Sequence, residues 1–177
     1  MQCDVLSGEY LNSLTGVSDL HDEKTDVAVG SMDCVWRDPA SDRWVVRAIV
    51  RQLDGAERSK AEAMVADEKV DLEGEAVDVP ALAELGPGYV EHWSSDGSQD
   101  EFKAVVVANS YLLRVSYRPS DAKLSDAATA VVDMAATLSG DLPKVEAASP
   151  TSQGSYGTDG SGDAAVTASS DLSSRLG

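Results

Sequence analysis

Two short turns between alternating apolar segments constrain the fold of this chain most strongly. An Asp-Gly pair at 96–97 separates the segment 89–95 from the segment 102–109, and an Asn-Ser pair at 109–110 separates the latter from 111–118. Turn pairs of this kind join neighbouring antiparallel strands. The three segments therefore predict an antiparallel meander.

A second hairpin is predicted earlier in the chain. The segments 27–36 and 44–53 have apolar patterns typical of strands, and the turn-forming residues 38–42 (Asp-Pro-Ala-Ser-Asp) lie between them. Residues 17–26 are polar and predict a loop. Residues 70–88 are interrupted by proline and glycine and are expected to hold no long element.

Apolar residues spaced three and four apart predict three helices. The first begins after Ser7, a residue type that caps helices, and stops at Gly16. The second covers 56–69, and the last covers 125–138 and ends at Gly140. The predicted element order is α-β-β-α-β-β-β-α, which favours an α+β fold in which helices pack on an antiparallel sheet.

Composition divides the chain into two parts. Residues 1–144 carry all of the predicted helices and strands. Residues 145–177 consist largely of Ser, Gly, Thr, Ala and Asp, and they offer too little apolar surface to offset the entropy of ordering. We therefore expect one α+β domain followed by a disordered tail.

The strongly acidic charge excludes some partners. The formal net charge is −17 at pH 7, which repels nucleic acid and anionic lipid and favours a soluble monomer. No stretch of 18 apolar residues exists to span a membrane, and the start Met1-Gln2-Cys3 lacks the features of a signal peptide. The chain is then either cytosolic or a mature exported domain.

The chain contains two cysteines, Cys3 and Cys34. Cys3 precedes the first predicted helix and Cys34 falls within a predicted strand, so a disulfide would tie the N-terminus to the sheet. Such a bond places the protein outside a reducing cytosol. The alternative is two buried free thiols in a cytosolic protein.

A family resemblance rests on these cysteines and the element order. Cys3 before a Leu-rich helix, Cys34-Val35-Trp36 in a strand and an Ala-rich last helix at 127–138 resemble the actinobacterial secreted lipoproteins of unknown function with a Cys…Cys-x-Trp signature. That group resembles the Mog1/PsbP-like α/β/α sandwich superfamily, and in outline it is similar to extracellular sensor domains of mycobacterial receptor kinases.

The resemblance implies an exported cell-envelope protein that binds or senses something, and it implies no catalytic residues. Members often have a second cysteine pair, which this chain lacks. Because Met1-Gln2-Cys3 does not match a lipobox, Cys3 is interpreted as a disulfide partner, with any signal or lipid anchor removed or located upstream.

Four arginines on predicted strands form the first candidate binding site. Arg47 and Arg51 share one strand face, as do Arg114 and Arg118. If these strands are neighbours, the four guanidinium groups gather into a site for an anionic ligand or for partner carboxylates. The alternative is an exposed face on which the arginines pair with Glu or Asp from flanking helices.

Aromatic residues of the meander form the second candidate. Trp93, Tyr89 and Tyr111, together with Tyr117, could line a groove beside these strands and anchor a ligand or a partner. The alternative is that most of them pack in the core.

Signals for catalysis or for a metal are weak. His21 lies in an acidic segment that is more typical of a solvated loop than of a metal site, and residues 96–101 match only the start of a calcium loop. His92 could act as an acid or base, but no Gly-x-Ser-x-Gly or Walker motif accompanies it. We therefore expect no enzyme, no cofactor and no metal.

The sequence as a whole predicts a non-catalytic exported domain that binds a small ligand or a protein partner at the cell envelope. One alternative is a structural or accessory subunit of an extracellular assembly, which would need a large exposed apolar patch. Another is a small hydrolase, which would need an imidazole within hydrogen-bond reach of a nucleophile in a cleft.

Overall fold

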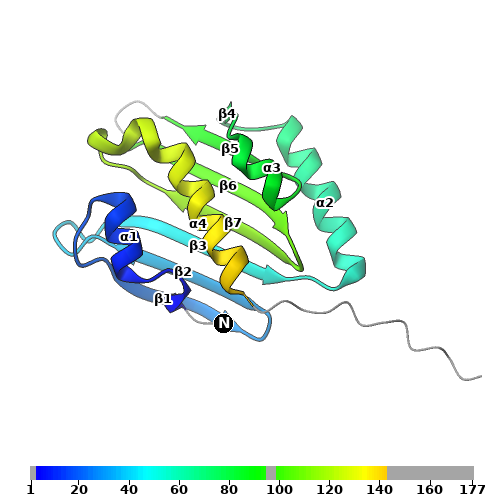
Figure 1. Cartoon of the computed structure of the whole chain (residues 1–177), viewed down its shortest axis with the longest axis horizontal. Coiled ribbons are helices and arrows are strands. Elements are labelled where there is room, and N and C mark those ends of the chain that lie inside the picture. Colours follow the sequence, from blue (N-terminus) through cyan, green and yellow to red (C-terminus); the bar gives the residue numbers. More distant parts are fainter. Residues whose placement is uncertain (1–2, 95–98, 143–177) are drawn as a thin grey trace, which may run out of the picture. The chain divides into compact units, whose positions relative to one another are not determined.

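The computed structural model describes residues 3–94 and 99–142, with the side chains of residues 24–28 excepted (Figure 1). The predicted Asp-Gly turn at 96–97 and the predicted tail at 145–177 lie outside the described residues, as does the predicted end of the domain at residue 144. All of the statements that follow concern the described part of the chain.

The fold is α+β and is built on one seven-stranded sheet in which every neighbouring pair of strands is antiparallel. The spatial order is β1-β2-β3-β7-β6-β5-β4. The strands are β1 (His21–Ala28), β2 (Ser31–Arg37), β3 (Trp44–Gln52), β4 (Glu75–Val77), β5 (Gly88–Trp93), β6 (Glu101–Ala108) and β7 (Tyr111–Tyr117). The pairing of β3 with β7 joins the early hairpins to the later meander (Figure 1).

The first helix begins and ends where its capping residues predict. The helices are α1 (Gly8–Thr15), α2 (Gly55–Val70), α3 (Pro80–Leu85) and α4 (Ala127–Asp141), with two 3₁₀ turns, η1 (Cys3–Val5) and η2 (Asp121–Asp126). The hydroxyl of Ser7 accepts the N–H of Tyr10 at 3.2 Å, which confirms Ser7 as the cap of α1. Gly16 ends this helix with φ +72°, in the left-handed region that glycine tolerates.

The two faces of the sheet bury different amounts of apolar surface. Val106 and Leu113 point toward α4 and belong to the large core, whereas the adjacent Val105 and Leu112 belong to a smaller cluster with Val65 of α2. Because successive strand residues point to opposite faces, α2 and α4 cover opposite faces of the sheet. We call these the α2 face and the α4 face.

The sequence did not predict β1, and this is the largest correction to the predicted order. Residues 17–26 were expected to be a loop, but β1 occupies 21–28 and pairs along β2 with one irregularity between Lys24 and Asp26. An edge strand is held by backbone hydrogen bonds on one side only, so its side chains need not alternate between apolar and polar. The single strand predicted at 27–36 is instead the end of β1, a turn through Gly30 (φ +80°) and β2.

Two short elements, β4 and α3, lie in residues 70–88, for which the sequence predicts no long element. β4 adds three residues to the edge of β5, and α3 begins with Pro80 at its first turn. At the C-terminal end, α4 continues through Gly140 to Asp141 rather than ending at the glycine. Gly140 is exposed and has no positive φ, so nothing in its backbone stops the helix.

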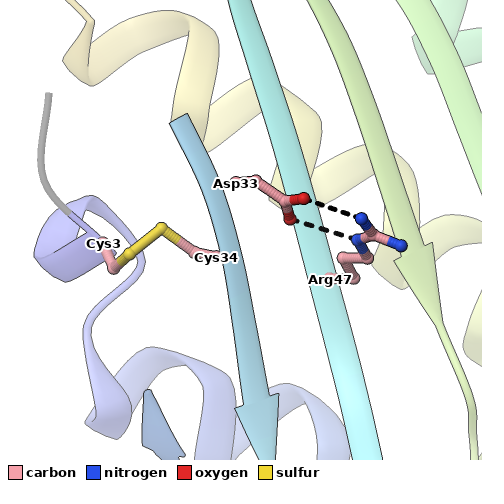
Figure 2. Close-up of a disulfide and its surroundings, with 4 residues drawn as sticks. All are labelled: Cys3, Asp33, Cys34 and Arg47. Atoms are coloured by element: carbon pink, nitrogen blue, oxygen red, sulfur yellow. Dashed lines mark hydrogen bonds and ion pairs between the residues drawn. A yellow bond between two sulfur atoms is a disulfide. The ribbon is translucent and has the colours of Figure 1, made fainter. Parts of the chain in front are cut away.

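Cys3 and Cys34 form a disulfide that joins η1 to β2, with their Cα atoms 5.7 Å apart (Figure 2). Both side chains are buried in the main core, at 1% and 0% exposure. The bond settles the choice between a bridge and two free thiols in favour of the bridge. It fixes the N-terminal segment against the α4 face of the sheet.

Candidate binding groove between α2 and strands β3 and β7

The structure brings the four predicted arginines together on the α2 face. β3 and β7 are neighbours, with Ile49 opposite Arg114 and Arg47 opposite Ser116. Arg51 lies opposite Leu112, and the backbone N–H of Arg118 donates to the carbonyl of Val45 at the end of the same ladder. The four side chains therefore share one sheet face.

Each of these arginines forms an ion pair with a carboxylate. Two carboxylates come from neighbouring strands and two from α2. The pairs are Arg47–Asp33 at 2.7 Å, Arg51–Glu57 at 2.7 Å, Arg114–Glu68 at 2.8 Å and Arg118–Glu101 at 3.1 Å. All four arginines are therefore paired, as in the cross-paired alternative, but only two of the partners come from a helix, whereas that alternative expected helix partners.

Figure 2 shows how adjacent residues of β2 act on opposite sides of the sheet. Cys34 forms the disulfide on one side, and the carboxylate of Asp33 accepts two hydrogen bonds from the Arg47 guanidinium on the other, at 2.7 and 3.1 Å. This fork geometry raises the pKa of Arg47, chiefly through the hydrogen bonds to Asp33. Arg47 is thus held by an ion pair within the protein. Arg118 is held in the same way by Glu101, and its guanidinium carbon also lies 3.6 Å from the centroid of the Trp44 ring.

A groove of about 450 Å³ opens beside the other two arginines, between α2 and strands β3 and β7. We call it the α2 groove. Its apolar lining comes from Ile49, Leu53, Ala61, Met64 and Leu112, and its charged lining comes from Arg51, Glu57, Lys60 and Arg114.

The local sequence explains how α2 forms one wall of this groove. Asp54 caps the helix directly after β3, and its carboxylate and the Glu57 side chain hydrogen-bond to each other's backbone N–H groups. Lys60 and Met64 follow Glu57 at helical spacing and therefore face the sheet on the same side.

One polar network anchors α2 over the sheet. One oxygen of the Glu68 carboxylate accepts from Arg114 at 2.8 Å, and the other accepts the Tyr89 hydroxyl at 2.9 Å. Burial and the hydrogen bond to Glu68 raise the pKa of Tyr89, so the phenol stays protonated and donates. Arg114 is therefore held in place at one end of the groove.

The basic groups of the groove keep free hydrogen-bonding capacity. Arg51 and Arg114 each donate to carboxylates through a single terminal nitrogen among the described residues, although a guanidinium carries five N–H donors. Lys60 makes no ion pair within this part of the chain.

The aromatic candidates do not gather at one site. Trp93 is 48% exposed at the end of β5, whereas Tyr89 and Tyr111 are buried. Tyr89 packs with the small cluster on the α2 face, and Tyr111 packs in the large core on the α4 face. No single groove can therefore be lined by all three.

A small polar pocket lies beside Trp93. The Glu91 side chain on its wall is only 3% exposed, yet one of its oxygens contacts the Lys103 ammonium at 2.6 Å and the other accepts the Gly74 N–H at 2.7 Å. Burial acts to raise the pKa of Glu91, but the hydrogen bonds from Lys103 and from the backbone outweigh burial and hold the pKa below its ordinary value. Glu91 therefore ties the segment before β4 to β5 and β6.

Replacing Glu91 tests this tie. Glu91→Gln should lower the free energy of unfolding by about 2 kcal/mol at pH 7, because it leaves the Lys103 ammonium without its buried partner. Since the folded pKa is depressed, the stabilisation is present above the ordinary glutamate pKa of about 4.3 and is lost as pH falls through the folded pKa. Urea unfolding from pH 7 to pH 3 should show the difference from the parent protein shrinking in acid. Glu84→Gln, at an exposed position on α3, is the control, and a difference that stays constant with pH would contradict the assignment.

His92 is half-buried on β5 and lines a pocket with Glu75 and Trp93. Its ring stacks on Phe102 with centroids 4.3 Å apart, and its Nε2 atom lies 2.8 Å from Asp100. The hydrogen bond from His92, together with one from Ser94, lowers the pKa of Asp100.

His21 begins β1 with an exposed side chain opposite Arg37. The described residues contain no group of three or more His, Cys, Asp or Glu side chains arranged to hold a metal ion. Among the same residues, no helix has both the length and the apolar character needed to cross a bilayer.

Sequence reasoning found Arg51 and Arg114, but it missed Lys60 and the two glutamates, Glu57 and Glu68. A signal was available, because these three residues and Met64 recur three or four positions apart on one face of the predicted helix. This spacing does not show which face of the sheet the helix covers.

Comparison of the chain with protein-family models, with curated proteins and with solved structures finds no match in any of the three. The function is therefore argued from the groove and from the chemistry of its side chains.

Proposed function

We propose that this chain is a non-catalytic, exported domain of the cell envelope, related in kind to the Mog1/PsbP-like sandwiches, and that it binds a ligand or a protein partner in the α2 groove. The observation that carries the proposal is the groove itself, where an apolar floor and three basic side chains meet at one surface. Ligand sites commonly combine such a floor with a few polar groups that fix orientation.

The disulfide supports an exported location. Disulfides persist in oxidising compartments and are rare in a reducing cytosol. The Cys3–Cys34 bond and the net charge of −17 fit an acidic protein that stays soluble outside the cytosol.

The chemistry of the groove favours binding over catalysis. Its lining contains no histidine, cysteine, serine or threonine, and its one carboxylate, Glu57, already contacts Arg51 and the backbone of Asp54. Covalent and acid–base catalysis need an activated nucleophile or a free proton carrier within reach of the substrate. These groups can orient an anion but have no free base to offer.

An accessory subunit of an extracellular assembly remains the alternative from another class. Such a role would be favoured by one large exposed apolar patch. Among the described residues, the exposed large apolar side chains lie apart on different segments: Val29, Val70, Trp93 and Leu124. The groove is therefore the better supported site.

A groove-blocking variant tests the proposal even while the ligand is unidentified. Ile49→Trp places an indole on the floor of the α2 groove, and Ser116→Trp places one on the same sheet face outside it. Each protein is incubated with an extract of the cells from which the protein comes, desalted and weighed intact by native mass spectrometry.

We expect a bound mass on the parent protein and on Ser116→Trp, and its loss from Ile49→Trp. Circular dichroism verifies that all three proteins are folded. No bound mass on the parent, or one that survives in Ile49→Trp, would reject the groove as the binding site.

A further inference from the structure

The pairing of β3 with β7 sets basic and apolar side chains side by side on the groove floor. Ile49 lies opposite Arg114, and Arg51 lies opposite Leu112. Directly opposed strand residues have Cβ atoms about 4.5–5.5 Å apart. A ligand whose charged group reaches either arginine therefore has apolar surface immediately beside that group.

The charged lining favours an acid over a base. Three cations line the groove, Arg51, Lys60 and Arg114, and two carboxylates pair with them, Glu57 with Arg51 and Glu68 with Arg114, in a protein whose net charge is strongly negative. Each arginine keeps unused N–H donors in a planar fork that matches a carboxylate, and the ammonium of Lys60 has no ion-pair partner in the described residues. A carboxylate can accept from these donors and is attracted to the ammonium of Lys60, which would repel a cationic head group.

The apolar lining and the size of the groove favour a small flexible ligand. Leu53, Met64 and Leu112 provide the floor and wall, and methionine adapts its side chain to irregular partners. The volume of about 450 Å³ lies in the range of roughly 300–1,000 Å³ that is typical of small-molecule sites. It suits one aliphatic chain better than a folded partner.

We infer that the α2 groove binds a single-chain aliphatic carboxylate, with the acid at Arg51 and Lys60 and the chain along Ile49, Met64 and Leu112 toward Arg114. This inference rests on the proposed function and names the class of ligand that the groove takes. It also predicts the charge of the ligand's head group: the site selects a negative head group, although the protein carries a large negative charge.

The methionine methyl groups provide the readout. Met64 lies in the groove, whereas Met32 and Met134 are buried in the large core and serve as internal controls. Protein labelled with ¹³C at the methionine methyls is titrated with dodecanoate below its micelle concentration. Met64→Leu identifies the groove signal.

We expect a saturable shift of the Met64 signal while the signals of Met32 and Met134 stay in place. Dodecyltrimethylammonium, with the same chain and a positive head, should shift none of them. Arg51→Gln/Lys60→Gln should weaken dodecanoate binding by at least about 10-fold, since charged hydrogen bonds contribute roughly 1.5–3 kcal/mol. Arg43→Gln removes an exposed positive charge outside the groove and should leave the affinity unchanged.

The outcomes separate this inference from the proposed function. Equal binding of the cationic and anionic amphiphiles, or shifts confined to Met32 and Met134, would overturn the carboxylate assignment. If Ile49→Trp abolishes a bound mass in the extract assay but dodecanoate does not bind, the groove binds a ligand of another class and only this inference fails. If the bound mass proves to be a peptide or a protein, the carboxylate inference likewise fails and the proposed function stands. If neither assay shows binding to the groove, both proposals fail.

Discussion

Removal of the Cys3–Cys34 disulfide is expected to lower the free energy of unfolding by about 3–4 kcal/mol. The bond joins residues 31 positions apart, and cross-linking a loop of that length restricts the unfolded chain while leaving the folded core in place. Cys3→Ala/Cys34→Ala is the suitable variant because both side chains are buried, and a serine hydroxyl there would have to find a partner. Urea unfolding of the parent and the variant measures the difference.

Alkylation under two conditions provides the control for this prediction. Because both sulfur-bearing side chains are buried, labelling must be done in denaturant, where a free thiol would react and a disulfide would not. We expect no label on the denatured, unreduced protein and two labels after reduction. Labelling before reduction would show free thiols and would remove the main support for an exported protein.

The disulfide and the groove lie on opposite faces of the sheet, which makes their effects separable. Cys34 points to the α4 face, whereas Ile49 and Arg114 point to the α2 face. The disulfide-free variant, where it remains folded, should therefore keep its affinity for dodecanoate. If the variant is partly unfolded and binding falls only as far as the folded fraction falls, the result agrees with this separation.

The sequence was most informative where a strand is buried on one face. The alternation through β2 and β3 predicted which residues face the main core, because a shift of one residue would turn every side chain to the other face. β1 carries no such signal, since it is a polar edge strand held by its backbone pairing with β2. β4 has three residues and α3 has six, which is too short for periodicity to register.

The candidate site was predictable in part for a related reason. That Arg47 and Arg51 share a face follows from strand geometry alone, and so does the pairing of Arg114 with Arg118 on one face. The carboxylate partners of Arg51 and Arg114 lie on α2, and their position depends on how the helix crosses the sheet, which is a tertiary feature. The sequence therefore located the positive charges but not the acids that neutralise them, nor the groove between helix and sheet.

Two glycines show how differently one residue type can act, and substituting each with alanine should change stability in opposite directions. Gly86 ends α3 with φ +147°, and a Cβ atom there would overlap the backbone carbonyl of Val107 on β6. Because neither the backbone conformation nor the neighbouring strand can accept a side chain, Gly86→Ala should cost about 3 kcal/mol or more. The chain can pass this close to β6 only with glycine at this position.

Gly140→Ala is the matched control, because a Cβ atom at Gly140 meets nothing within 4 Å and the residue lies inside α4. Alanine is the better helix former, so this variant should gain about 0.5 kcal/mol. Thermal and urea unfolding of both variants measure the two signs. A neutral Gly86→Ala would mean that the loop onto β6 moves aside freely, and a destabilised Gly140→Ala would mean that α4 ends at the glycine, as the sequence alone predicts.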